Sequence, residues 1–319
     1  MHFRSLPCLH SRLLLIRSCL IKNGTIVKIP ETALIAGCGY VGRRVAATWH
    51  ASGMQVSAIT RSELKAKELA NAGITPILID LAQATPIPQL PDIDVVLWSV
   101  GFERPSSAPR QAIWIDGLQR LLSALPRRTD PRRILYTSST SVYGDGQGQD
   151  VDEHTLPIPN SEGGNACFAA EQLLQDFGRQ SSVCVSILRL AGIYGPDRLL
   201  RRTADLQSNV PIMSPPDEWL NLIHVDDAVT AIDRISTMKS PPSLINIVAS
   251  QSVTRREYYT TLAKLVNAPP PTFAAPTAVS SSQPPRRGGN RRVVSGVRES
   301  LQILFKYDSI MDGLSAAFP

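Results

Sequence analysis

The feature that most constrains this chain is a glycine-rich loop between a strand-like run and a helix-like run. Residues 32–36 are apolar, and the hexapeptide 37–42, Gly-Cys-Gly-Tyr-Val-Gly, follows them directly. A helical pattern then continues to about Ser52 and ends at Gly53. A helix N-terminus that opens after such a turn offers unpaired N–H groups and partial positive charge to phosphates. The sequence therefore predicts a dinucleotide-binding fold.

Each glycine of this loop has a separate expected role. Gly37 allows the tight turn, Gly39 lets the backbone approach a pyrophosphate, and Gly42 lets the helix pack closely on the strand. Tyr40 and Val41 complete the loop, and all five residues are predicted to bind the cofactor.

The end of the second predicted strand indicates which dinucleotide is bound. NAD-preferring loops place a carboxylate there for the ribose hydroxyls, but the chain has none between Glu31 and Glu63. Arg61 stands at that point between two hydroxyl residues, an arrangement suited to a 2′-phosphate. The sequence favours NADP, with NAD as the alternative, because Arg61 is also typical of an ordinary surface residue.

Two further strand ends are predicted to contact the cofactor. Asp80 and Leu81 follow the third strand, where they would meet the adenine edge. Ser99, Val100 and Gly101 follow the fourth strand and could cover the adenosine ribose.

Short β-rich runs alternate with helical stretches, which calls for a parallel sheet covered on both faces. Six parallel strands are expected, at residues 32–36, 55–59, 75–79, 94–98, 133–138 and 183–188. The predicted fold class is α/β, a Rossmann-type doubly wound parallel sheet with a small C-terminal α+β substrate lobe. Three regions are expected. Residues 1–30 form an extension that is expected to be disordered, because it lacks apolar periodicity, and residues 31–190 form a Rossmann domain. Residues 191–319 form a lobe that is interleaved with the sheet and includes the Pro/Ser-rich connection 267–289.

Later elements have clear local signals. A strand-like segment is expected near Leu222 and another at 244–248, with helices at 225–236 and 254–266. The second of these helices opens at Thr254, and Glu257 has the spacing of a capping box.

Charge and cysteine content exclude several classes. The net charge is +6, but much of the excess lies in residues 1–30 and 286–298, which favours solvated basic segments over a nucleic-acid surface. The five cysteines are scattered without metal-ligand spacing, which predicts no metal and a cytoplasmic location. No apolar run approaches membrane-spanning length. The expected partner is a small molecule, the oligomeric state is open, and residues 1–30 fit either a transit peptide or an over-long gene start.

Three longer motifs, together with the glycine loop, resemble one family. They are the segments 136–145 (YTSSTSVYGD), 188–196 (LRLAGIYGP) and 221–227 (NLIHVDD). In this order they resemble the extended short-chain dehydrogenase/reductase family, in its NAD-dependent epimerase/dehydratase group. The resemblance runs from about Thr32 to the C-terminus and implies a Rossmann domain, a small substrate domain and hydride transfer on sugar-like substrates.

The same resemblance implies a catalytic hydroxyl residue and a Tyr-x-x-x-Lys pair. Ser139 matches the hydroxyl position, but the tyrosine position falls on Gly163 and the lysine position on Cys167. Neither can do the family's acid–base work. The chain is therefore similar to an atypical subgroup that lacks the pair.

Remaining candidates have both functional and structural interpretations. Tyr143 is the first choice for a replacement proton donor at the edge of the substrate cleft, although a tyrosine in such a turn is as often only packing. Tyr194 is expected to border the nicotinamide, and His224 is more typical of a structural histidine than of a substrate contact. Two functions stay open: an NAD(P)-dependent oxidoreductase or epimerase-like enzyme acting on a small polar or sugar-like carbonyl or alcohol, and a non-catalytic NADP(H)-binding sensor or regulatory protein.

Overall fold

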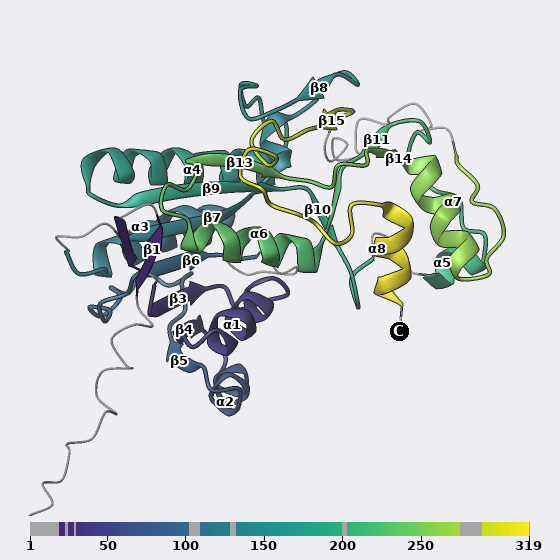
Figure 1. Ribbon diagram of the computed structural model, residues 1–319. Helices are drawn as coiled ribbons and strands as arrows, with labels where there is room; N and C mark the ends of the chain where they lie inside the picture. Colours follow the sequence, from purple (N-terminus) through teal and green to yellow (C-terminus); the bar gives the residue numbers. More distant parts are fainter. Residues whose placement is uncertain are drawn as a thin grey trace, which may run out of the picture.

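The computed structural model describes residues 30–101, 109–127, 132–199, 203–274 and 289–318. It also describes the backbone of the strands β1 (Cys19–Lys22) and β2 (Thr25–Lys28), which pair with each other antiparallel. Figure 1 shows a sheet with helices on both sides and, at one end of it, a smaller group of helices that includes the C-terminus.

The centre of the molecule is a seven-stranded sheet in the order β13-β9-β7-β6-β3-β4-β5, and every neighbouring pair is parallel. Its strands are β3 (Thr32–Ala36), β4 (Gln55–Thr60), β5 (Thr75–Leu78), β6 (Val95–Trp98), β7 (Arg133–Ser139), β9 (Cys184–Leu190) and β13 (Leu244–Ile247). From β3 the chain continues to β4 and β5 on one side of β3, and the next strand, β6, pairs on the other side. Open α/β sheets bind ligands at this switch point, so the fold places a site at the carboxyl ends of β3 and β6.

The expectation of six sheet strands is wrong, because the sheet has seven. The segment 244–247 was expected as a strand after residue 190 and outside the six, but it pairs in parallel with β9, with Ile245 opposite Leu188. Its apolar residues are buried, as an outer strand covered by helices requires. More than fifty residues separate β9 from β13, and local periodicity carries no information about such a pairing.

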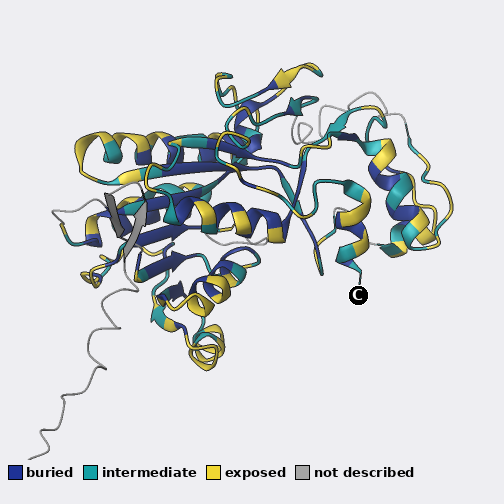
Figure 2. Cartoon of the chain, in the orientation of Figure 1, coloured by how far each residue is buried: buried dark blue, intermediate teal, exposed yellow. Residues whose placement is uncertain are grey.

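Helices cover both faces of the sheet. On one face lie α1 (Gly42–Ala51), α2 (Glu63–Asn71) and α6 (Val225–Thr237), and on the other lie α3 (Gly117–Ala124) and α4 (Glu162–Gln180). Two apolar clusters fill the spaces between these layers. Figure 2 shows the pattern, with buried strands inside and helices that are exposed only on their outer sides.

A turn of π-helix, η2 (Ala112–Asp116), directly precedes α3. A short 3-10 turn, η3 (Thr140–Tyr143), follows β7. Single π turns inside helices are frequent at functional sites. Both turns lie at the end of the sheet where ligands are expected.

The residues after β9 also build a smaller lobe with an apolar cluster of its own. The lobe contains β10 (Gly192–Tyr194), α5 (Thr203–Gln207), β11 (Trp219–Leu220), β12 (Leu222–His224), β14 (Val253–Thr254), α7 (Arg255–Leu265) and α8 (Ile310–Ala317). β10 pairs in parallel with β12, and β11 pairs antiparallel with β14. Two short strands, β8 (Asp150–Val151) and β15 (Arg292–Val293), join the chain after η3 to the C-terminal segment.

Side chains cap several helices, and one of these caps was predicted from the sequence. Thr254 and Glu257 form the predicted capping box at the start of α7. The Ser62 side chain caps α2 by accepting a hydrogen bond from the Lys65 N–H. Ser161 caps α4 by accepting one from the Gly164 N–H.

Two predicted segments fall largely outside the described residues. They are the extension at 1–30, of which only residue 30 and the backbone of β1 and β2 are described, and residues 275–288 of the connection 267–289. Within the described part of the chain, no helix combines the length and apolar character needed to cross a membrane.

Candidate dinucleotide and substrate site

The carboxyl ends of the parallel strands bring most of the predicted site residues to one edge of the sheet. The glycine loop follows β3, Arg61 follows β4, and Ser99 follows β6. The Ser99 N–H donates to the Ala36 carbonyl at 2.7 Å, which holds the segment after β6 against the glycine loop. These segments, remote in sequence, therefore share one edge.

The geometry of the glycine loop explains each glycine. Gly37 has φ +93°, and a Cβ there would overlap the Ser99 carbonyl. A Cβ on Gly42 would overlap the Gly37 carbonyl. A Cβ on Gly39 would meet nothing within 4 Å. The fold therefore requires glycine at residues 37 and 42. At residue 39 the absence of a side chain instead leaves the backbone accessible in front of α1.

The N-terminus of α1 offers the charge that an anion needs. No side chain caps it, and its first turn carries no acidic residue. The backbone dipole and Arg43 in the first turn both favour a phosphate at this point.

Tyr40 does not point into the open space before the helix. Its hydroxyl donates to the Pro196 carbonyl oxygen at 2.8 Å. The Arg44 guanidinium lies 4.2 Å from the Tyr40 ring centroid, and Arg198 lies 5.2 Å from it. Burial raises the pKa of the Tyr40 phenol. The side chain thus anchors the loop, so a contribution of residue 40 to cofactor binding would come through its backbone.

Positive charge gathers around the end of β4. Burial raises the pKa of the Cys38 thiol to about 11, and the nearby positive charges of Arg43 and Lys65 act in the opposite direction. Both cations are therefore close to the glycine loop, and Arg61 is exposed at the end of β4. The sequence analysis predicted Arg61 as the only cation at this strand end. Lys65 follows four residues later, and its closeness in the sequence could have indicated a second cation there.

Asp80 and Leu81 lie just beyond β5, which ends at Leu78, so they follow the third strand as predicted. Asp80 Oδ1 accepts a hydrogen bond from the Ala82 N–H at 2.9 Å, so its carboxylate shapes the turn. The Leu81 carbonyl accepts from Arg120 Nη2 at 2.6 Å. Val100 packs partly buried against the core, and Gly101 is exposed.

Ser139 caps the turn that follows β7. Its Oγ accepts the Ser141 N–H at 3.1 Å, and the side chain is half-buried. From the C-terminal segment, Arg291 donates to the carbonyls of Thr140, at 2.9 Å, and of Gly144. The buried Arg291 side chain thus fixes the turn that carries Ser139, a role that the sequence did not reveal.

Tyr143 lies in the interior and not at an open edge. It is 3% exposed, and its hydroxyl donates to Asn246 Oδ1 at 2.8 Å. The Arg189 guanidinium stands 4.8 Å from the ring centroid. Burial raises the pKa of the Tyr143 phenol. The expected position at the edge of a substrate cleft is not the one that the structure shows, and a role as proton donor stays a prediction.

A buried ion pair adjoins Tyr143. Glu171 on α4 is fully buried and accepts hydrogen bonds from Arg189 on β9, with Nη2 2.7 Å from Oε2. Ser138 Oγ donates to Glu171 Oε1 at 2.5 Å. This network ties α4 to β7 and β9, and it fixes the register of the helix that carries residues 163 and 167.

Tyr194 and His224 are both 1% exposed. Their rings meet edge to face at 5.3 Å, and Tyr307 covers His224 at 4.1 Å. His224 Nδ1 accepts the Asp226 N–H at 3.2 Å, so the residue caps α6, and its buried Nε2 has no hydrogen-bond partner among the described residues. A substrate could reach either ring only if the covering segment moved, so these contacts stay predictions.

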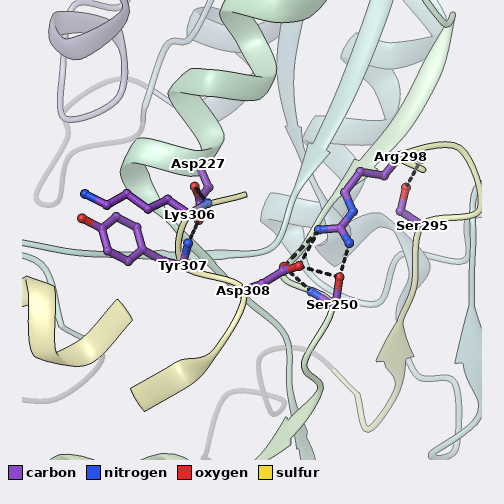
Figure 3. Close-up of polar contacts among 7 residues, drawn as sticks. All are labelled: Asp227, Ser250, Ser295, Arg298, Lys306, Tyr307 and Asp308. Atoms are coloured by element: carbon purple, nitrogen blue, oxygen red, sulfur yellow. Dashed lines mark hydrogen bonds and ion pairs between the residues drawn. The ribbon is translucent and has the colours of Figure 1, made fainter. Parts of the chain in front are cut away.

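Hydrogen bonds hold the C-terminal segment, residues 289–309, against α6 and against the chain just beyond β13 (Figure 3). Asp227 on α6 accepts the N–H groups of Lys306 at 2.7 Å and Tyr307 at 2.9 Å. Asp308 accepts from the Ser250 N–H at 2.8 Å, just beyond β13, and from Arg298 Nη1 at 3.0 Å. These bonds hold Tyr307 over His224.

The two positions of the missing Tyr–Lys pair lie in the first turns of α4. Gly163 is followed by Gly164, which lies against the Ser141 carbonyl of η3. Cys167 is 6% exposed, and burial raises the pKa of its thiol to about 11. Neither offers an acid or base to a substrate.

The parallel sheet, the switch point and the glycine loop together define a dinucleotide-binding protein of the Rossmann class. The sequence profile of the NAD dependent epimerase/dehydratase family matches residues 33–247. Protein YeeZ of Escherichia coli (strain K12) is 30% identical over 239 residues, which cover 73% of this chain and 82% of YeeZ. The chain belongs to the NAD dependent epimerase/dehydratase family, which confirms the resemblance seen in its motifs.

Solved structures have the same fold. A functionally unknown conserved protein from Silicibacter pomeroyi superposes with a TM-score of 0.71 at 24% identity, covering 90% of this chain and 98% of the other. The UDP-glucuronic acid 4-epimerase from Bacillus cereus, in complex with UDP-glucuronic acid and NAD, has a TM-score of 0.71 at 20% identity, covering 90% and 97%. At these identities the likeness establishes the fold.

Proposed function

We propose that this protein is an NADP(H)-dependent enzyme of the epimerase/dehydratase type that acts on a sugar-like alcohol or carbonyl. The observation that carries the cofactor choice is the positive charge near the end of β4, where Arg61 is exposed and where Arg43 and Lys65 act electrostatically on Cys38 of the glycine loop. A 2′-phosphate is the part of NADP that this charge would recognise.

The residues at the end of β4 also disfavour NAD. An enzyme that selects NAD holds the ribose hydroxyls with a carboxylate at this strand end, and here Thr60 and Arg61 occupy it. A charge-assisted hydrogen bond to a phosphate contributes roughly 1.5–3 kcal/mol. One such contact corresponds to about a tenfold to hundredfold preference.

We assign the pyrophosphate and the adenosine of the dinucleotide to separate parts of the site. The backbone at Gly39 and the uncapped start of α1 would hold the pyrophosphate. The turns after β5 and β6, with Asp80, Leu81 and Ser99 to Gly101, would hold the adenosine. When bound, the nicotinamide supplies the hydride acceptor or donor.

The substrate class is proposed from the family and from one neighbour. The Bacillus cereus enzyme contains UDP-glucuronic acid together with NAD, on a fold that covers 90% of this chain. A nucleoside diphosphate sugar is therefore the first substrate class to test. The lobe built by α5, α7 and α8 would face it at the carboxyl end of the sheet.

Binding titrations of NADPH and NADH test the cofactor choice. Wild-type protein is expected to bind NADPH ten to a hundred times more tightly, and Arg61→Ala should remove most of that preference. Arg179→Ala is the matched control, because Arg179 is an exposed arginine paired with Asp176 on α4. Equal affinities of the wild type for the two cofactors would refute the assignment of NADP.

A non-catalytic NADP(H) sensor is the second candidate. It is favoured by Gly163 and Cys167, which leave the usual proton-transfer positions without an acid or base. Incubation with NADP⁺ and a panel of nucleotide sugars separates the two candidates. Cofactor reduction or sugar interconversion supports the enzyme, whereas tight NADPH binding without any conversion supports the sensor.

We also place the protein in a reducing compartment such as the cytoplasm. The described cysteines Cys38, Cys167 and Cys184 are all free thiols, which fits that environment. Labelling the protein with a thiol reagent directly after gentle lysis would test the redox state.

A further inference from the structure

An arginine approaches the position of the missing tyrosine. Among the described residues beyond its own helix, the one atom within 4 Å of a Cβ built on Gly163 would be the Arg110 Nε, at 3.9 Å. Arg110 comes from a different part of the chain, directly before the π turn η2. The fold therefore brings a permanent positive charge to the place where the family's acid–base pair is absent.

Arg110 holds a carboxylate at the same place. Its Nη1 lies 2.6 Å from Glu162 Oε2, and the two side chains are 12% and 70% exposed. The cation is thus largely buried and its partner is open to solvent. Glu162 is also in the first turn of α4, where the helix dipole favours a negative charge.

This ion pair lies beside the turn that carries Ser139. The first turn of α4 packs on η3, with Gly164 against the Ser141 carbonyl, and the Ser139 hydroxyl caps η3. No lysine occurs in the sequence between Lys67 and Lys239 that could replace the family's lysine. The other candidates from the sequence are held elsewhere, since Tyr143 is bonded to Asn246 in the interior and His224 lies beneath Tyr307.

We propose that Glu162 is the proton-transfer group of this enzyme and that Arg110 positions it, a replacement for the Tyr–Lys pair supplied by two segments of the chain. The inference rests on the proposed function. In the oxidative direction, a Glu162 carboxylate oxygen takes the hydroxyl proton of the substrate, and the O–H electron pair forms the C=O bond. The carbinol C–H bond breaks at the same time, and its hydrogen leaves with both electrons to the oxidised nicotinamide. In the reverse direction the protonated Glu162 returns the proton to the oxygen.

The decisive variant is Glu162→Gln, which keeps the size of the side chain and removes its capacity to take a proton. Positioned acid–base groups contribute roughly 10²–10⁴-fold to rate. We expect turnover of UDP-glucose or UDP-glucuronic acid with NADP⁺ to fall at least a hundredfold. The dissociation constant for NADPH and the melting temperature should stay close to the wild-type values. Asp176→Asn is the matched control, because Asp176 is a paired, exposed carboxylate on the same helix.

Three further variants separate proton transfer from a structural role. Glu162→Asp should recover part of the lost turnover, because it keeps a carboxylate. Arg110→Gln should lower kcat much more than it raises KM, and Arg110→Lys should recover part of the loss, because lysine restores a positive charge beside the carboxylate. A merely structural ion pair would change the melting temperature and leave kcat close to the wild-type value.

The outcomes distinguish this inference from the proposed function. A wild-type enzyme that turns over a sugar, with Glu162→Gln within threefold of it, overturns the role of Glu162 and leaves the proposed function intact. A wild-type protein that binds NADPH but converts none of the sugars overturns both. A large loss of turnover in Glu162→Gln at unchanged NADPH affinity supports the inference.

Discussion

The hydroxyl of Tyr40 donates a hydrogen bond to the carbonyl oxygen of Pro196 at 2.8 Å, and this bond ties the glycine loop to the turn that follows β10. Two segments separated by more than 150 residues thus meet at the cofactor side of the sheet. The Tyr40 ring also packs under Arg44, so the hydroxyl and the ring make separate contributions.

Tyr40→Phe tests the contribution of the hydroxyl alone. The ring and its contact with Arg44 remain, so we expect a loss of about 0.5–1.5 kcal/mol in the free energy of unfolding. For a chain of this size that corresponds to a fall of a few degrees in melting temperature. Thermal unfolding followed by circular dichroism measures it. A melting temperature identical to that of the wild type would show that the hydrogen bond does not stabilise the protein.

Two alanine substitutions in the glycine loop should have opposite effects. Gly37→Ala places a methyl group on the Ser99 carbonyl at φ +93°, so it should cost about 1–3 kcal/mol of stability. Gly39→Ala meets no neighbour within 4 Å, so stability should change little. The methyl group at residue 39 would instead obstruct the pyrophosphate and raise the dissociation constant for NADPH at least about tenfold. Denaturant unfolding and NADPH titration of both variants measure the two effects. The opposite pattern, with a loss of stability in Gly39→Ala and unchanged stability in Gly37→Ala, would contradict this assignment.

Tyr143→Phe tests whether the Tyr143 hydroxyl has a structural or a catalytic role. The substitution leaves the buried Asn246 Oδ1 without its donor, which costs roughly 1–3 kcal/mol of stability. Because the phenol is 3% exposed, we expect turnover to stay within threefold of the wild type. Denaturant titration and steady-state kinetics give the two numbers. A loss of turnover of tenfold or more would restore Tyr143 as the proton donor.

His224 should make the stability of the protein depend on pH. Burial lowers the pKa of its imidazole below the usual 6.5, with smaller opposing contributions from Asp226 and Asp227. The unfolded chain then binds a proton more readily than the folded one. The stabilisation is therefore complete above about pH 6.5 and is lost as the pH falls from there toward the lower pKa of the folded state.

The measurement is the free energy of unfolding between pH 8 and pH 5 for the wild type and for His224→Asn. Asparagine can keep the cap on α6, so the comparison concerns the slope of stability with pH and not its absolute level. We expect a smaller slope in the variant. Identical slopes would mean that His224 titrates alike in both states.

Elements with strong local signals could be predicted from the sequence, and pairings between distant segments could not. β3 and the Thr254–Glu257 capping box fall where they were expected, because each depends on neighbouring residues. β13 was recognised as a strand but not as part of the central sheet, since its partner β9 lies far away in the sequence.

The candidate site shows the same division. The glycine loop and Arg61 are visible as a motif, whereas the ion pair of Arg110 with Glu162 joins two segments that lie far apart in the sequence. The burial of Tyr143 depends on Asn246, one hundred residues later, and no periodicity around residue 143 indicates it.

The parallel pairing of β13 with β9 sets the order in which the chain can complete its fold. Until residue 247 has left the ribosome, the backbone groups on one side of β9 have no partner, and the strand is the edge of an unfinished sheet. Unpaired edges are templates for pairing with other chains. A fragment that ends at residue 190 would carry this edge permanently, so it should aggregate where the full chain remains monodisperse. We therefore expect the Rossmann sheet and the substrate lobe to fold as one unit, because the chain must pass through the lobe before its last sheet strand is made.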